Sequence, residues 1–114
     1  MEPVKHPKGW GYELWITNNE KYCGKILHFD KGKRCSYHYH KLKKETFYVE
    51  SGKVEVVYGY GDRSKADSII LNAGNNFEVP IGLIHQIVAI EESKIYEFST
   101  THFESDSYRI ELGD

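Results

Sequence analysis

The chain has 114 residues, a formal net charge of −2 and a hydrophobic fraction of 39%. This length predicts a single domain, residues 1–114, and the scattered Lys and Arg residues form no broad basic surface, so we expect no nucleic-acid partner. Because no apolar run is long enough to cross a bilayer and the first residues lack the apolar stretch of a secretory signal, we expect a cytoplasmic protein with no membrane partner.

Short runs of β-branched and aromatic residues alternate with turn-forming residues along the whole chain. The pattern predicts strands near residues 12–17, 22–29, 34–40, 45–50, 53–60, 68–71, 77–79, 84–90, 94–100 and 108–112. No segment has the period of a helix. Antiparallel strands this short can remove their edges by curling into a closed barrel, so we predict an all-β, jelly-roll barrel.

Three histidines and one glutamate form a candidate metal site. His38 and His40 lie two residues apart on one predicted strand, and Glu45 begins the next strand. Because side chains alternate between the two faces of a strand, both imidazoles point the same way. A proline–glycine turn then aims His85 at the same point. This ligand set predicts one divalent transition metal, namely zinc, iron, manganese, nickel or cobalt.

The same residues stand at the separations of the two cupin motifs. Residues 32–52 match G-x5-H-x-H-x4-E-x6-G, and residues 74–85 match G-x5-P-x-G-x2-H. The chain therefore resembles the cupin superfamily, which implies a double-stranded β-helix with the metal and its ligand inside the barrel. One departure is Ala89, where the second motif often has Asn. The histidines outside the motifs are expected to be ordinary surface or strand residues: His6, His28 and His102.

Strand alternation predicts which side chains line the cavity. Counting by twos from the metal ligands selects Arg34, Ser36, Phe47, Val49, Leu83 and Ile87. On the predicted strand 94–100, Glu97 shares a face with Ile95 and Ser99. Burying a carboxylate between apolar neighbours costs desolvation free energy, so we expect this one to have a function. We expect Glu97 to act as a general base or acid. The alternative is an outward Glu97, with Tyr96 and Phe98 in the core.

Segments at both ends resemble a narrower family. Residues 8–15, KGWGYELW, with residues 24–45 and the tail 96–110, are similar to the cupin domain of type II mannose-6-phosphate isomerases. Two departures are the four residues between the second histidine and the glutamate, where that family usually has three, and Gly9 in place of a proline. The resemblance implies a sugar or sugar-phosphate substrate and isomerisation of an aldose to a ketose.

That reaction needs a metal-polarised carbonyl, a proton-moving group and an anchor for the phosphate. Glu97 is the expected catalytic residue. The expected phosphate anchors are Arg34, Arg109 and one lysine of the turn at residues 41–44, for which we select Lys44. The alternatives are that the lysines belong to a solvated turn and that Arg109 only pairs with Asp106.

Other functions use the same ligand set. An iron-dependent dioxygenase would place substrate and oxygen at the open metal positions, and a non-catalytic sugar-binding module would use the metal as an anchor. Resemblance to cupins also implies a homodimer formed through the outer sheet. Cys23 and Cys35 are expected to be free structural thiols, because the cytosol keeps thiols reduced.

Overall fold

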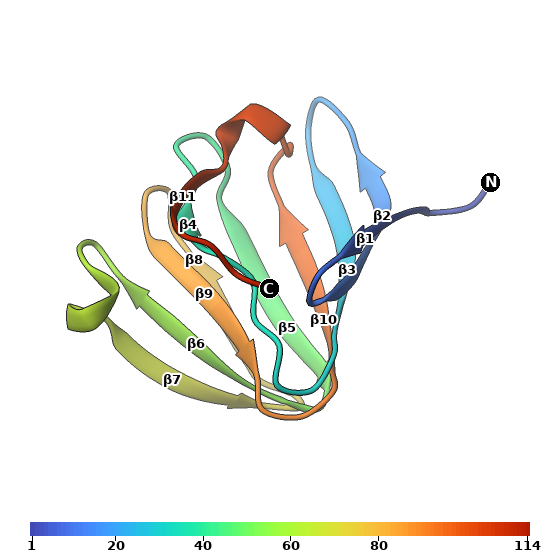
Figure 1. Ribbon diagram of the computed structural model, residues 1–114. Coiled ribbons are helices and arrows are strands. Elements are labelled where there is room, and N and C mark those ends of the chain that lie inside the picture. Colours follow the sequence, from blue (N-terminus) through green and yellow to red (C-terminus); the bar gives the residue numbers. More distant parts are fainter.

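The computed structural model describes residues 1–114 and consists of two antiparallel β-sheets that enclose a common interior (Figure 1). The strands are β1 (Val4–Lys8), β2 (Gly11–Asn18), β3 (Cys23–Phe29), β4 (Tyr37–Tyr39), β5 (Glu45–Ser51), β6 (Lys53–Gly59), β7 (Asp67–Asn72), β8 (Asn76–Val79), β9 (Ile84–Ala89), β10 (Ser93–Ser99) and β11 (Tyr108–Glu111). Two single-turn 3-10 helices, η1 (Arg63–Lys65) and η2 (Glu104–Asp106), complete the structure. Neither helix has the length or apolar character needed to cross a membrane.

The larger sheet has six strands in the order β1-β2-β3-β10-β5-β8, and the smaller has five in the order β11-β4-β9-β6-β7. Because most neighbours in each sheet, such as β3 and β10 or β4 and β9, come from distant parts of the chain, the two sheets are interlocked in the manner of a jelly roll. The all-β, jelly-roll prediction is confirmed.

Nine of the predicted strands agree with the observed bounds to within one residue at each end. The predicted strand 34–40 is shorter, because only Tyr37–Tyr39 pair as a strand and Arg34 forms an isolated bridge to Val88. Strand β1 was not predicted. It contains Pro7, and it forms the edge of the larger sheet, which is where a sheet tolerates a proline.

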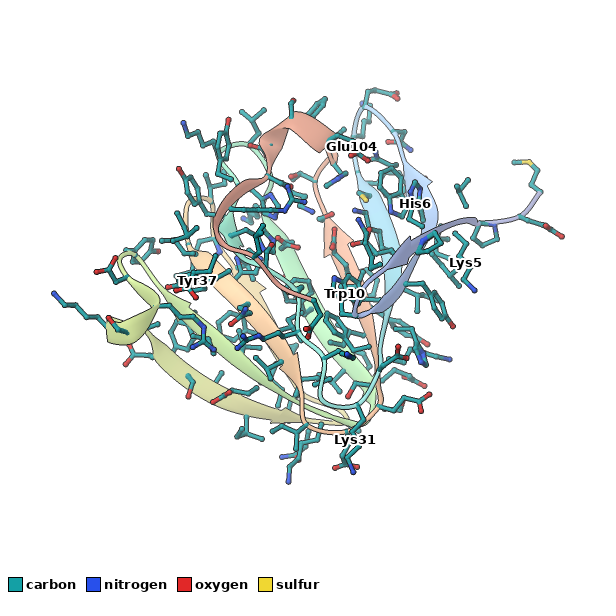
Figure 2. All side chains as sticks on the ribbon, in the orientation of Figure 1. Lys5, His6, Trp10, Lys31, Tyr37 and Glu104 are labelled. Atoms are coloured by element: carbon teal, nitrogen blue, oxygen red, sulfur yellow. The ribbon has the colours of Figure 1, made fainter.

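The core lies between the sheets and forms the floor of the site. Alternation on β3 buries Cys23, Leu27 and Phe29 together with one lysine, Lys25. Trp10, in the β1–β2 turn, stacks on Phe29 with ring centroids 4.1 Å apart, and Figure 2 shows Trp10 toward the middle of the molecule. Both cysteines are buried and free, as predicted.

The connection between β5 and β6, where the chain passes from one sheet to the other, gives a test of the fold. Gly52 has φ +90°, and a Cβ at this position would collide with the carbonyl oxygen of Glu92. We expect Gly52→Ala to lower the free energy of unfolding by about 2 kcal/mol and the midpoint of thermal unfolding by roughly 10 °C. The matched control is Gly61→Ala, because open space surrounds Gly61. Equal midpoints for the two variants would contradict this account of the connection.

Candidate metal centre

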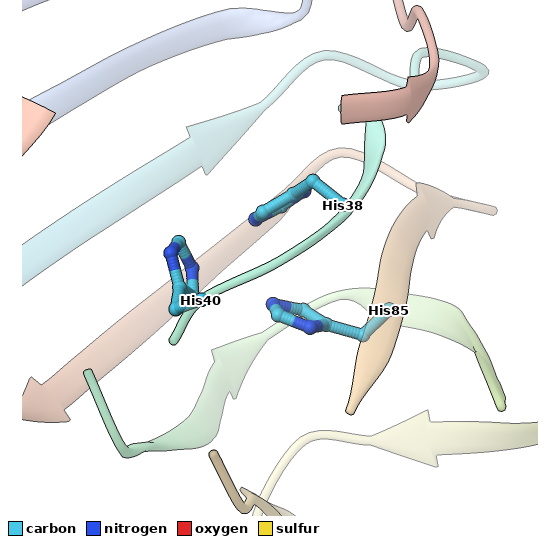
Figure 3. Close-up of side chains that lie close together, drawn as sticks. All are labelled: His38, His40 and His85. Atoms are coloured by element: carbon cyan, nitrogen blue, oxygen red, sulfur yellow. The ribbon is translucent and has the colours of Figure 1, made fainter. Parts of the chain in front are cut away.

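Two strands of the smaller sheet bring three imidazoles together. His38 projects from β4, and His40 directly follows the last residue of that strand. His85 projects from β9, where it is the direct cross-strand partner of His38. One nitrogen from each ring lies within 4.8 Å of the others. Figure 3 shows the three rings converging from the two strands. The cluster could therefore hold a single ion.

In each of these histidines the ring nitrogen that faces away from the cluster, Nδ1, is hydrogen-bonded to a backbone carbonyl group. The Nδ1 atoms donate to the carbonyl groups of Ser36 for His38 (2.9 Å), Asp106 for His40 (2.8 Å) and Leu83 for His85 (3.0 Å). Because a carbonyl oxygen can only accept, each Nδ1 carries the proton and each Nε2 is left with a lone pair. This is the tautomer that a metal ligand requires. Burial, and then the neighbouring His85 and His40, lower the pKa of His38 well below its usual value, which keeps that ring neutral.

Glu45, the first residue of β5, completes the cluster. Its Oε2 atom lies 3.1 Å from Nε2 of His40 and 3.4 Å from Nε2 of His85. Both Glu45 Oε2 and His85 Nε2 are buried and without a hydrogen-bond partner. With protons on the Nδ1 atoms, each neutral ring turns an acceptor towards the Glu45 carboxylate, which is unfavourable unless a second proton or a metal ion lies between them. The four side chains therefore fit a divalent transition metal.

The charge on Glu45 is held in place by its neighbours. Burial alone would raise the pKa of this carboxyl, but the close contacts with His40 and His85, together with the ammonium group of Lys43, hold the pKa well below its usual value. Glu45 is therefore ionised at neutral pH. An ionised carboxylate beside neutral imidazoles is the protonation state that binds a metal most strongly.

A cavity of about 320 Å³ opens over these ligands, between the two sheets. Its wall contains Glu45 and the three histidines, and its floor contains core residues such as Phe47 and Ile87. This volume is within the range of small-ligand sites. A small molecule in the cavity can therefore contact the metal ligands and the opposite sheet at once.

Glu97 lies inside the barrel, as the alternation on its strand predicts. It is 4% exposed, whereas Phe98 is 58% exposed on the outer face. Glu97 Oε2 accepts hydrogen bonds from Nζ of Lys43 (3.1 Å) and Oγ of Ser99 (2.9 Å). Burial and the negative charge of Glu45 raise the pKa of Glu97, and Lys43 partly offsets this. The alternative of an outward Glu97 is wrong.

The other residues predicted for the cavity divide into two groups. Ser36, Phe47, Ile87 and Arg109 line it. Val49 and Leu83 belong to the packed core and do not line the cavity.

Two of the expected phosphate anchors lie away from the cavity. Arg34 is exposed because the chain leaves the strand geometry before β4, so that alternation cannot be counted back to it. Lys44 is also exposed, whereas Lys43 is buried and reaches Glu97, Glu45 and the ring of His102. Of the lysines in this turn only Lys43 lines the cavity, because it lies two residues before Glu45 and so shares its inward face.

His102 was expected to be an ordinary residue, but it lines the cavity. Nζ of Lys43 donates to Nδ1 of His102 at 3.1 Å. Burial, followed by the charges of Lys43 and Lys25, lowers the pKa of His102 to about 3, so the ring is neutral. His102 lies on the loop after β10, and strand alternation gives no signal for a loop residue.

Asp106, in η2, organises the turn that carries Lys43. Its carboxylate accepts hydrogen bonds from the backbone N–H groups of Lys41, Leu42 and Lys43, at distances between 2.9 and 3.2 Å. Its backbone carbonyl is also the acceptor for His40. The alternative pairing of Asp106 with Arg109 is absent. Burial opposes ionisation, but the three N–H donors lower the pKa of Asp106 below its usual value.

A family model described as a cupin domain matches residues 25–98. The chain therefore belongs to the cupin domain family. No curated protein sequence matches the chain at a significant level. The more specific resemblance to type II mannose-6-phosphate isomerases remains a prediction.

Solved structures of cupin-like form superpose on most of the chain. The capsular polysaccharide assembling protein CapF from Staphylococcus aureus has a TM-score of 0.85 at 16% identity, with 98% of this chain and 32% of that chain covered. KdgF from Halomonas sp. has a TM-score of 0.76 at 18% identity, covering 90% and 91% of the two chains. Oxalate decarboxylase from Bacillus subtilis has a TM-score of 0.79 at 19% identity, covering 95% and 30%. At these identities the likeness shows the fold alone, and the chain spans about a third of CapF.

The metal site makes a direct prediction. We expect His40→Ala and His85→Ala each to weaken the affinity for Zn²⁺ or Co²⁺ by about 100-fold or more, because each removes one of four ligands. Isothermal titration of the purified variants with each ion measures this. His28→Ala is the matched control, since His28 stacks on Tyr12 away from the cavity. Unchanged affinity in both site variants would contradict the assignment.

The Asp106 cap predicts a pH dependence. Because its folded-state pKa is depressed, its stabilisation is present above the unfolded pKa of about 4 and is lost as pH falls through the folded pKa. We expect Asp106→Asn to lower the free energy of unfolding by about 1–3 kcal/mol at pH 7, and this difference to shrink towards pH 3. Denaturant titrations of both proteins across this range measure it. If the difference in unfolding free energy between the two proteins did not change with pH, the charge of the Asp106 carboxylate would not be the cause of the stabilisation.

Proposed function

We propose that this protein is a metal-dependent cupin that acts on a sugar or sugar phosphate, and that its reaction is aldose–ketose isomerisation of the mannose-6-phosphate isomerase type. One observation carries the proposal. A buried carboxylate with a raised pKa, Glu97, lies in the same cavity as the three-histidine cluster, where Lys43 links it to Glu45. An enzyme that moves a proton next to a polarised carbonyl needs this pairing of groups.

His38, His40, His85 and Glu45 would hold the ion. When bound, a divalent metal supplies Lewis-acid polarisation of a carbonyl oxygen. Glu97 would take the proton from the hydroxyl-bearing carbon next to that carbonyl and return it to the former carbonyl carbon, while the hydroxyl proton passes to the former carbonyl oxygen. A raised carboxyl pKa favours this role, because it makes the group a stronger base once ionised.

Lys43 and Ser99 would keep Glu97 in position. Both donate to the same oxygen, Oε2, which leaves Oε1 available to the substrate. His102 receives a further hydrogen bond from Lys43, so the ammonium group is fixed between two partners. The proton-moving oxygen is thereby oriented before the substrate arrives.

The phosphate of such a substrate would lie at the mouth of the cavity. Arg109 lines the cavity, is exposed, and forms no ion pair with a carboxylate of the chain, so its guanidinium group is available to an anion. Lys8 also lines the cavity, is exposed and forms no ion pair with a carboxylate of the chain. The structural similarity to CapF, a capsular polysaccharide assembling protein, supports a role in carbohydrate metabolism.

The test begins with metal-loaded protein and mannose 6-phosphate. We expect fructose 6-phosphate to form, and Glu97→Gln to lower kcat by about 10²–10⁴-fold with metal affinity unchanged. The matched control is Glu78→Gln, because Glu78 is exposed on β8 and lies outside the cavity.

Three results would contradict the proposal in different ways. Full turnover by Glu97→Gln would remove Glu97 from the mechanism. Oxygen uptake by the protein after anaerobic loading with ferrous iron would point to a dioxygenase, because an isomerase consumes no oxygen. Sugar binding without turnover would leave a non-catalytic binding module.

A further inference from the structure

A second buried ion pair lies in the cavity, away from the metal ligands. Nζ of Lys25 on β3 lies 3.5 Å from Oε1 of Glu13 on β2. The Lys25 side chain is 2% exposed and that of Glu13 is 16% exposed, and both residues line the cavity. Neither belongs to a cupin motif, and the proposed reaction uses neither.

Burying the Lys25 ammonium group costs desolvation free energy, which suggests that the position has a function. It occupies one of the inward positions of β3, between Cys23 and Leu27, where the alternation otherwise buries apolar side chains. A buried ion pair is often no more stabilising than a well-packed apolar pair, because both charges lose their hydration. The pair is therefore poorly explained as a stabilising device alone.

The pair is also fixed in place. Nε1 of Trp15 donates to Glu13 at 2.8 Å, and the Lys25 ammonium lies 4.4 Å from the centre of the same indole ring. Although burial alone raises the pKa of Glu13, Lys25 and then Trp15 lower it below its usual value, so the carboxylate is ionised. The ammonium group forms no hydrogen bond to another side chain, so most of its three N–H donors remain available.

The pair continues a line of alternating charges that ends at the metal ligands. Lys25 is the direct cross-strand neighbour of Glu97. Glu97 is bound by Lys43, which lies 3.7 Å from Glu45. Donors and acceptors therefore alternate along one wall of the cavity, from Glu13 at one end to the metal ligand Glu45 at the other.

We propose that Glu13 and Lys25 form a subsite that binds two adjacent hydroxyl groups of a polyhydroxylated ligand, at the end remote from the metal. A carboxylate accepts and an ammonium donates, and a vicinal diol offers both functions at matching separation. Trp10, which lines the same cavity, supplies an apolar surface for the C–H face of the ligand. The proposal rests on the carbohydrate part of the proposed function and adds the residues that recognise hydroxyl groups.

D-Mannitol is the probe, because it offers vicinal hydroxyl groups but has no carbonyl to isomerise and no phosphate. Trp10 and Trp15 are the only tryptophans, and both line the cavity, so their fluorescence reports binding to zinc-loaded protein. We expect Glu13→Gln and Lys25→Met each to raise the dissociation constant for mannitol about tenfold or more, with zinc affinity unchanged. The matched controls are Glu78→Gln and Lys94→Met on exposed strand positions.

Thermal unfolding shows that each variant is folded before it is titrated. If Lys25→Met does not fold, the isosteric Glu13→Gln carries the test alone. No mannitol binding by the wild type, or equal affinity in wild type and site variants, would overturn the subsite.

The outcome is separable from that of the proposed function. If the protein converts mannose 6-phosphate but its affinity for mannitol does not depend on Glu13 and Lys25, the proposed subsite is wrong and the proposed isomerase function stands. If mannitol binding depends on both residues but the protein has no isomerase activity, the subsite stands and the proposed isomerase function is wrong.

Discussion

The site depends on one electrostatic constraint, which is that buried acceptors face one another at its centre. The backbone holds the protons of His38, His40 and His85 on their outer nitrogens, so that their lone pairs point inward towards the Glu45 carboxylate. Such an arrangement is stable only when a cation neutralises it. The strands that position these groups therefore define a metal centre before any chemistry is considered.

The same constraint accounts for the rest of the cavity wall. Lys43 reaches Glu45 from the turn that Asp106 caps, and it also holds Glu97 in a fixed orientation. Charges in a β-barrel are expensive, and here each is paired with the next along the larger sheet. A polar ligand that bridges the metal ligands and this wall would replace its hydrogen bonds to water with hydrogen bonds to these charged groups, which is the basis of the proposed carbohydrate recognition.

The clustering of the three histidines and most strands could be predicted from the sequence because period-two alternation and motif spacing act locally. The same alternation, carried back from Glu45, selects Lys43, and applied to β3 it would have drawn attention to Lys25. It failed at Arg34 because the chain there is no longer in a strand. His102 could not be found at all, since its place depends on how a loop folds back over the cavity.

The central claim is best tested by ¹⁵N NMR of the histidine rings during titration with Zn²⁺. The account predicts that Nδ1 of His38, His40 and His85 stays protonated while Nε2 of the same three rings shifts on binding, and that His6, His28 and His102 do not change. Zinc binding that leaves the Nε2 signals of these three histidines unshifted would contradict it.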